Sequence, residues 1–362
     1  MSPFLRTAWQ RLTGCAARPS APAPAPIPLR PLEPELAARI AAFWSSFESL
    51  RPRLERALPG ALPPALQQEL SARVDALEPQ LAWELGRAGD GVFELALSGE
   101  GRFPLRRLTE AWRQAAPAGL TRWRFLPARG ATPGHTQLDY AGHSVDLAQL
   151  AFALAPDEAR ARVDVTVWHP GFAEMEPGAR SAVAFLALDG LLGEDTVERW
   201  VGRVATELTR GEGFVDAQAL HAHVAALAAA PHDTFAHLQG KNAKGQAAMA
   251  TLNLALKRLD HLAYEDQLVV TLAYRSADAQ GLPTPEEHQA AQALEDQLLE
   301  QLAGLALHYG HVVSAGRLEV LFYVADKRAV EGRLAAWRER AQGWQVQRAW
   351  QHDPEWKALL KW

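Results

Sequence analysis

The feature that most restricts the fold of this chain is a change of apolar period near its C-terminal end. Between Leu268 and Tyr274, apolar side chains occupy every second position, which indicates a strand with one buried face. Thr284, Pro285 and Glu287 then form a capping box with a first-turn proline, which indicates the start of a helix. Apolar residues recur beyond this start every three or four positions, at Ala291, Leu294, Leu298, Leu302 and Leu305. A strand followed by an amphipathic helix is therefore expected.

The rest of this C-terminal module predicts a hairpin, a second helix, a last strand and a short helix. The hairpin is expected at residues 311–315 and 318–325, and the second helix at 326–343. The last strand is expected at 344–351, and the short helix from 353 onward. Gly316 and Arg317 suit a tight hairpin turn, Asp326 suits a helix N-cap, and Gly343 suits a helix end. The resulting order β-α-β-β-α-β is the ferredoxin-like arrangement, in which helices cover one face of an antiparallel sheet.

Three segments of the module carry a resemblance to a known family. They are the run Gly-Arg-Leu-Glu-Val-Leu-Phe-Tyr-Val-Ala-Asp at 316–326, Trp344 at a strand start, and Asp-Pro-Glu-Trp at 353–356. With them, the C-terminal region resembles the bacterial domain of unknown function 695, which is similar to the ribonuclease E inhibitor B proteins. The resemblance covers the last quarter of the chain. It implies a ferredoxin-like fold and, by analogy, a protein partner. It implies no catalytic residue, because the family has no established active-site motif.

The whole chain predicts an α+β protein with two domains and five successive regions. We expect a Pro/Ala-rich disordered tail at residues 1–32 and a helical hairpin at 33–80. An α+β domain with a mostly antiparallel sheet is expected at 81–209. A helical linker at 210–264 and the ferredoxin-like domain at 265–362 follow. Within these regions we expect a strand at 183–188, a helix at 194–208 and a helix at 246–262.

Composition limits the classes of function. A net charge of -5 and a pI near 6.2 argue against a broad nucleic-acid-binding face and favour a basic partner. The single cysteine, Cys15, excludes an intramolecular disulfide. Leu12 to Cys15 matches a lipoprotein cleavage box, but Arg6, Gln10 and Arg11 interrupt the apolar segment that a secretory signal needs. We therefore expect a cytoplasmic bacterial protein without a membrane segment.

The histidines do not predict a metal site. His221 and His223 are two residues apart, so on a helix their side chains point in different directions. His308 and His311 lie on either side of Gly310 with no carboxylate nearby in sequence. Zinc enzymes usually present a histidine pair at helical or strand spacing together with a third ligand. Core or solvated histidines are the simpler interpretation.

The carboxylates allow an ordinary structural interpretation as well. Glu286, Glu287, Glu295, Asp296 and Glu300 are expected on the solvated face of a helix. Asp189 with Gly190, and Gly193 with Glu194 and Asp195, form a charged turn between a predicted strand and a predicted helix. Functional sites occur in such turns, but helix capping explains these residues as well, and we favour that interpretation.

The chain lacks the common catalytic motifs. It contains no Gly-x-Ser-x-Gly sequence, no phosphate-binding loop ending in Lys-Ser/Thr and no dinucleotide fingerprint. The segment from Gly240 to Gly245 lacks the preceding strand and the terminal hydroxyl residue of a phosphate loop, so we interpret it as a flexible interdomain loop. We assign no catalytic, cofactor-binding or metal-binding residue and no cofactor.

These observations favour a non-catalytic protein-binding or regulatory module, similar to an inhibitor or an immunity protein. Ferredoxin-like sheets present an open face or edge to partners. Trp337, Trp344, Trp350 and Trp356 crowd into the module, and outward-facing members would form a binding surface. The alternative is a hydrolase or nuclease with its site in the interdomain cleft, which convergence of Asp189, Glu194 or histidines on one pocket would favour. A structural component of a larger assembly is a third possibility.

Overall fold

The computed structural model describes residues 26–58, 60–88, 91–132, 136–232 and 234–362. The expectations for most of the N-terminal tail, Cys15 included, lie outside these residues. The chain forms two compact units, one from residues up to 157 together with 162–230, and one from 158–161 together with 231–362. Both contain helices and sheets, so the predicted α+β class is confirmed. No helix among the described residues has the length and apolar character needed to cross a bilayer.

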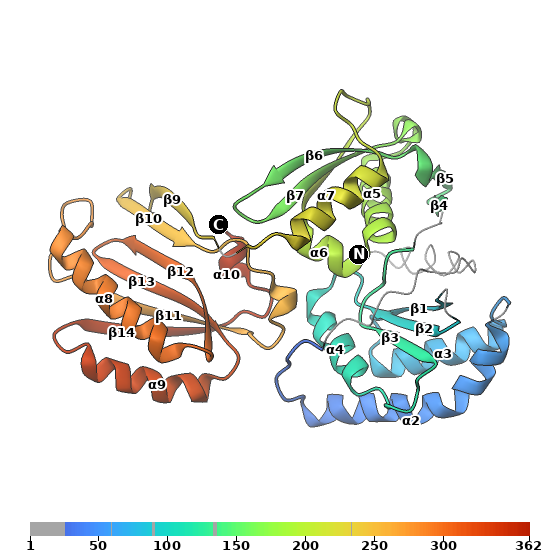
Figure 1. Cartoon of the computed structure of the whole chain (residues 1–362), viewed down its shortest axis with the longest axis horizontal. Helices are drawn as coiled ribbons and strands as arrows, with labels where there is room; N and C mark the ends of the chain where they lie inside the picture. The colour runs from blue at the N-terminus through green and yellow to red at the C-terminus, as the bar shows by residue number, and fades with distance from the viewer. Residues whose placement is uncertain (1–25, 59, 89–90, 133–135, 233) are drawn as a thin grey trace. The chain divides into compact units, whose positions relative to one another are not determined.

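The first half of unit 1 is a three-stranded sheet covered by a helical hairpin (Figure 1). Its elements are α2 (Pro34–Ala57), α3 (Pro64–Leu77), β1 (Ala82–Arg87), β2 (Phe93–Ser98), α4 (Phe103–Gln114) and β3 (Trp123–Leu126). Strand β2 pairs antiparallel with β1 and parallel with β3. The centre of this core is aromatic, because Trp44 of α2 stacks on Trp112 of α4 at 5.1 Å between ring centroids. The Trp44 Nε1–H donates to the Trp112 carbonyl at 3.0 Å, so the buried indole is satisfied.

The second half of unit 1 repeats this plan of a hairpin, a helical connection and a parallel third strand. Its elements are β4 (Gln137–Tyr140), β5 (His143–Asp146), β6 (Ala151–Asp157), β7 (Arg162–Trp168), α5 (Pro177–Leu192), α6 (Glu194–Trp200), β8 (Val201–Glu207) and α7 (Ala217–Ala229), with short 3-10 turns at Leu147–Gln149 and Pro170–Glu174. Strand β7 pairs antiparallel with β6 and parallel with β8. The described part of this region therefore contains three separate small sheets, in which three strand pairs are antiparallel and two are parallel.

Two expectations for this half were wrong. The run 183–188 lies inside helix α5 and is not a strand. It is apolar on nearly every side, and such a run does not distinguish a buried helix from a buried strand. The expected helix 194–208 ends at Trp200, after which β8 begins at Val201. The residues from Val201 onward pair with β7, so the tertiary partner overrides the helical preference of the preceding turn.

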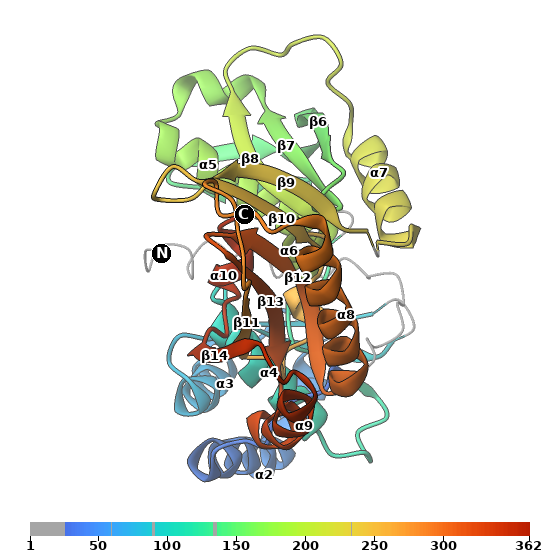
Figure 2. The ribbon, with the colours of Figure 1, turned by 90° about the vertical axis from the view of Figure 1, so that its left-hand side faces the viewer.

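Unit 2 is a six-stranded sheet with the ferredoxin-like order at its centre. Its elements are β9 (Ala236–Lys241), β10 (Ala247–Leu252), β11 (Asp266–Ala273), α8 (Pro285–Leu302), β12 (Ala306–Ser314), β13 (Arg317–Val324), α9 (Lys327–Arg340), β14 (Gln345–His352) and α10 (Lys357–Leu360), with a 3-10 turn at Arg258–Asp260. The strand order is β14-β11-β13-β12-β10-β9, and all neighbours are antiparallel. Figure 2 shows α8 and α9 on one face of the sheet and α10 on the other. The predicted β-α-β-β-α-β order is thus observed, extended by one hairpin.

That hairpin corrects two further expectations. The expected helix 246–262 is instead β10 followed by a loop with one short turn. The segment from Gly240 to Gly245 is the end of β9 and the turn that connects it to β10, not an interdomain loop. Alanine-rich sequence at 247–250 has no strong strand preference, and pairing with β12 decides its conformation.

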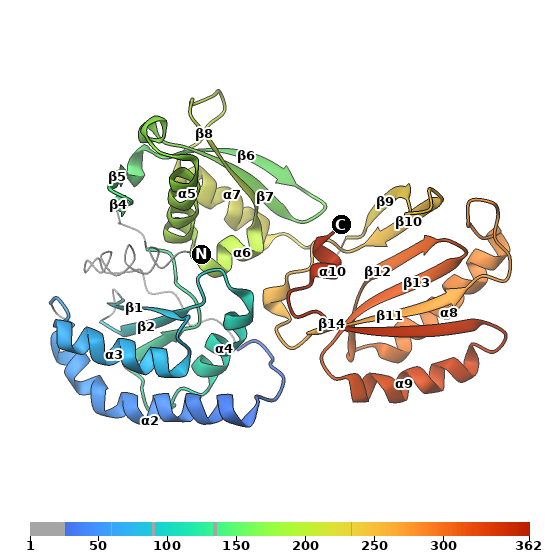
Figure 3. The same ribbon diagram turned by 180° about the vertical axis from the view of Figure 1, so that it is seen from behind.

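The sheet of unit 2 has a core on each face. Residues of β11 and β13 pack under α8 and α9 around Trp337, which is fully buried. On the other face, Trp356 stacks on Tyr323 at 4.4 Å between ring centroids and its indole N–H donates to the Tyr264 carbonyl at 2.8 Å. Figure 3 shows the C-terminal segment with α10 on this second face. Both faces are therefore occupied over the central strands, and the sheet meets solvent mainly at its edges.

Candidate functional site

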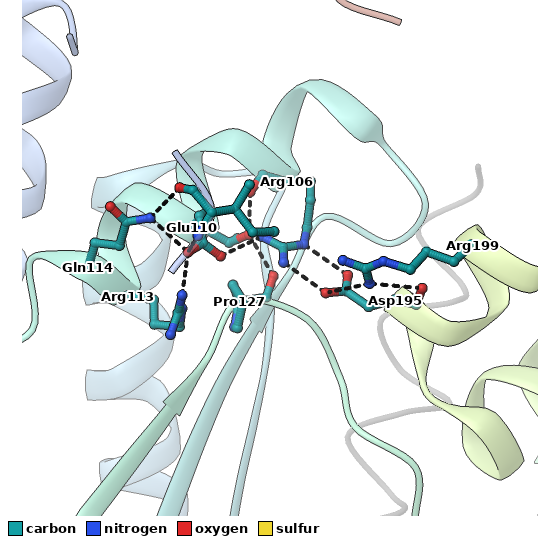
Figure 4. A network of polar contacts seen from close by, with 9 residues as sticks. Arg106, Glu110, Arg113, Gln114, Pro127, Asp195 and Arg199 are labelled. Carbon is teal, nitrogen blue, oxygen red and sulfur yellow. Dashed lines mark hydrogen bonds and ion pairs between the residues drawn. The ribbon is translucent and has the colours of Figure 1, made fainter. Parts of the chain in front are cut away.

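A buried group of charges in unit 1 joins helix α4 to helix α6 (Figure 4). The Arg106 guanidinium donates through Nε and Nη2 to the two carboxylate oxygens of Asp195, at 2.9 and 2.8 Å. Its Nη1 donates to Glu110 at 3.1 Å, one helical turn away. Glu110 also accepts hydrogen bonds from Arg113 and Gln114. Arg106 and Glu110 are almost completely buried, so this is an internal network and not a solvated surface pair.

The network is fully charged. Burial alone would raise the pKa of Asp195, but the hydrogen bonds and charge of Arg106 outweigh burial and lower it. Glu110 behaves in the same way, since burial opposes ionisation while hydrogen bonds from Arg113 and Gln114 lower the pKa. Every ionised group here has a paired counter-charge, as buried charges require. The arrangement stabilises the junction between the two halves of unit 1 and leaves no carboxylate poised as an acid or a base.

A second group of charges forms around Glu194 at the start of α6. One carboxylate oxygen of Glu194 accepts from the Ser98 hydroxyl at 2.7 Å and lies 3.1 Å from the Arg129 Nε. The other oxygen accepts from the Arg129 backbone N–H at 3.0 Å. Arg129 Nη2 lies 3.3 Å from the carboxylate of Glu100. Glu194 therefore holds the loop after β3 against α6, and both of its oxygens are engaged.

Asp189, at the end of α5, is the exception. Burial and the charge of Glu194 together raise its pKa to about 8, because the charge of Arg129 opposes them only in part. Structure thus brings Asp189 and Glu194 near each other, which is one of the convergences that an enzyme would show. The predicted strand-to-helix turn is in fact a helix-to-helix turn, in which Gly193 with φ of 84° separates α5 from α6.

His221 and His223 do not join this group. His221 lies on α7 and its Nε2 contacts the Leu191 carbonyl at 2.9 Å, whereas His223 lies two residues farther along the same helix. In the described residues, no group of three or more His, Cys, Asp or Glu side chains is arranged to hold a metal ion.

In unit 2, the structure brings His308 and His311 to one carboxylate. They lie on strand β12, where a bulge between His308 and Gly310 changes the register. His311 Nδ1 lies 2.8 Å from Glu295 Oε1, and His308 Nε2 lies 3.7 Å from the same oxygen. Burial lowers the pKa of His308, and the charge of Glu295 opposes this only in part. Sequence reasoning missed this cluster because Glu295 belongs to helix α8 and the contact is tertiary. Glu295 is buried instead of solvated.

The four tryptophans of unit 2 divide into two kinds. Trp337 and Trp356 are buried and serve the two cores. Trp344 and Trp350 are partly buried at the margin of the first core. The Trp350 Nε1–H donates to Glu331 of α9 at 2.8 Å, and the Lys327 ammonium lies 5.6 Å from the Trp350 ring centroid. Trp350 therefore lies where the edge strand β14 meets the core under the helices.

Strand β14 is an edge strand of the sheet, and its side away from β11 is open in the described part of the chain. It pairs with β11 over eight consecutive residues without a bulge, and no strand in the described part of the chain lies beyond it. The Asp353 N–H donates to the Glu265 carbonyl at 2.8 Å, which places the odd-numbered residues of β14 in hydrogen bonds with β11. The Tyr274 N–H donates to the Gly316 carbonyl on the β13 side of β11. The even-numbered residues of β11 therefore bond to β13 and its odd-numbered residues bond to β14, which agrees with this pattern. The backbone groups of Val346, Arg348, Trp350 and His352 consequently point outward.

Comparison with curated proteins and with solved structures found no match. Over residues 239–361, which span β10 to β14 and the terminal helix, the chain matches the family described as Family of unknown function (DUF695), in agreement with the resemblance predicted for its C-terminal region.

Proposed function

We propose that this chain is a non-catalytic protein-binding module that accepts an extended segment of a partner protein as a further strand beside β14. The open side of β14 is the observation that carries this proposal. An unpaired strand edge offers a row of backbone donors and acceptors, and partners use such a row in β-strand addition. A regulatory, inhibitor-like or immunity-like role would follow if the bound segment belongs to the working surface of the partner.

The shape of β14 supports this role. Proteins usually protect exposed edges with bulges, proline, short strands or inward-pointing charges. Strand β14 has eight residues in regular register and contains no proline. The opposite edge strand, β9, is shorter and contains Gly240 near its end. Strand β14 is the longer template of the two.

One observation favours the enzyme alternative. Asp189 has a raised pKa beside Glu194 and Arg129, which is the property of a general acid. Glu194 is engaged by Ser98 and Arg129, so Asp189 lacks a free second carboxylate with which to divide acid and base roles. An activity abolished by Asp189→Asn, in a protein that still folds, would transfer the function to unit 1.

The experiment that tests the binding proposal uses two substitutions at one position. Arg348→Pro removes an outward N–H from β14, whereas Arg348→Ala removes the same side chain and retains the N–H. Tagged full-length proteins are used to capture partners from a lysate of the native cell. We expect a partner that wild type retains, that Arg348→Ala retains more weakly and that Arg348→Pro loses, while thermal unfolding of the two variants is similar. Equal retention by both variants, or no retained partner, would contradict the proposal.

A further inference from the structure

The charge near β14 is opposite in sign to that of the whole chain. The chain carries a net charge of -5, but the segment from Asp326 to His352 contains six Lys and Arg residues and three Asp and Glu residues. The six cations are exposed, and they are Lys327, Arg328, Arg333, Arg338, Arg340 and Arg348. Strand β14 itself contains no acidic residue. A partner that meets this edge therefore meets a local excess of positive charge.

Three side chains of β14 lie on the helix-covered face of the sheet. Val346, Arg348 and Trp350 pair across β11 with Leu272, Val270 and Leu268, which belong to the core under the helices. Val346 and Trp350 are partly buried in that core. Arg348 lies between them with its side chain 38% exposed. The edge thus presents an apolar, a cationic and an apolar position in succession on one face.

Arg348 is held in place and keeps donors available. Its Nε donates to Glu331 of α9 at 2.9 Å, and the Trp350 indole donates to the same carboxylate oxygen at 2.8 Å. The two terminal nitrogens of Arg348 make no hydrogen bond to any described residue. Lys327 lies 3.0 Å from the buried carboxylate of Asp266, and this ion pair neutralises part of the local positive charge. A guanidinium fixed at Nε with free terminal nitrogens suits a carboxylate that arrives from the open side.

We infer that the segment bound by β14 is acidic, with an Asp or Glu opposite Arg348 and apolar residues opposite Val346 and Trp350. This inference rests on the proposed function and specifies its ligand. Directly opposed residues of neighbouring antiparallel strands interact on the same face, and opposite charges or apolar pairs stabilise the pairing. The recognised pattern is apolar-x-acidic-x-apolar in an extended chain. Overall composition would instead select a basic partner.

The test uses synthetic peptides and the full-length protein. A fluorescein-labelled peptide Ser-Val-Thr-Glu-Thr-Val-Ser is titrated and followed by fluorescence anisotropy, beside matched peptides with Gln or Lys at the central position. The Glu peptide is expected to bind roughly fivefold more tightly than the Lys peptide, which corresponds to the usual strength of one cross-strand charge pair. Arg348→Glu should reverse this order. Lys241→Glu, the same charge change on the opposite edge strand, should leave it unchanged.

The outcomes separate this inference from the proposed function. Equal binding of the three peptides, or an order that responds equally to Lys241→Glu, would overturn the acidic specificity and leave edge pairing intact. Failure of all three peptides to bind would also overturn it. The binding proposal would then still stand if the captured cellular partner is lost with Arg348→Pro and retained with Arg348→Ala. If Arg348→Pro and Arg348→Ala retain the captured partner equally and Arg348→Glu leaves the order of peptide affinities unchanged, both the binding proposal and the acidic specificity are rejected.

Discussion

Asp189 and Asp195 lie close together in sequence, but their surroundings move their pKa values in opposite directions. Asp195 receives two hydrogen bonds from Arg106, which outweigh its burial and keep it ionised. Asp189 is partly buried beside the negative charge of Glu194, and so its ionised form is disfavoured. Neither difference is visible in the sequence, because Arg106 and Arg129 reach this turn from distant elements.

Replacing Asp189 should stabilise the protein at alkaline pH. Its pKa of about 8 in the folded chain lies above the unfolded value of about 4, so ionisation costs more in the folded state. Wild type should therefore lose stability relative to Asp189→Asn as the pH rises from 4 to above 8. Because water partly screens the group, we expect a difference of about 1 to 3 kcal/mol above pH 8. Urea unfolding across this pH range measures it, and parallel curves for the two proteins would contradict it.

Replacing Asp195 should have the opposite effect. Asp195→Asn leaves the buried Arg106 with Glu110 as its remaining counter-charge, and breaking a buried ion pair from one side is costly. We expect a loss of roughly 3 kcal/mol at pH 7. The pKa of Asp195 is lowered in the folded protein, so its contribution is present above the unfolded value and disappears as the pH falls. Urea unfolding at pH 7 and at pH 3 tests both statements. A penalty that is as large at pH 3 as at pH 7 would contradict the ionic explanation.

Among the elements, strand β12 depends on a glycine at its bulge. Gly310 has φ of 139°, and a Cβ there would lie 2.1 Å from the Thr251 carbonyl oxygen of β10. Gly310→Ala should therefore separate β10 from β12 and cost more than about 2 kcal/mol. Gly343→Ala is the matched control, because Gly343 has φ of 86° with open space around its Cβ position. It should cost only the backbone strain of about 1 kcal/mol. Thermal unfolding of both variants measures the difference, and equal losses would show that the close approach is unimportant.

Elements whose caps and period agree were predicted well from the sequence. Thr284 accepts a hydrogen bond from the Glu287 N–H, as the capping box requires, and helix α8 runs from Pro285 to Leu302. The hairpin turn was displaced by one residue, since Ala315 and Gly316 adopt positive φ and Arg317 begins β13. Strands β8 and β10 were missed, because each forms only where a neighbouring strand supplies its hydrogen bonds.

At the scale of the whole molecule, the second unit should depend on its added hairpin. Strands β9 and β10 extend the ferredoxin-like sheet, and Ala250, Leu252 and Leu254 belong to the core on its second face. A fragment of residues 231–362 should unfold cooperatively, whereas a fragment of residues 265–362 should be loosely packed because this core is opened. Thermal unfolding followed by near-ultraviolet circular dichroism distinguishes the two. Equal cooperativity would show that the hairpin is not needed for stability.

The sequence by itself determined the α+β class and the β-α-β-β-α-β order of the C-terminal region. These depend on local periodicity and on caps, which act between residues a few positions apart. Tertiary structure alone decided that Glu295 meets His308 and His311, that Asp189 and Asp195 differ in pKa, and that β14 is an edge strand with cations beside it. Pairing across a sheet and burial of charge join residues that are far apart in the chain, and no local pattern records which of them meet.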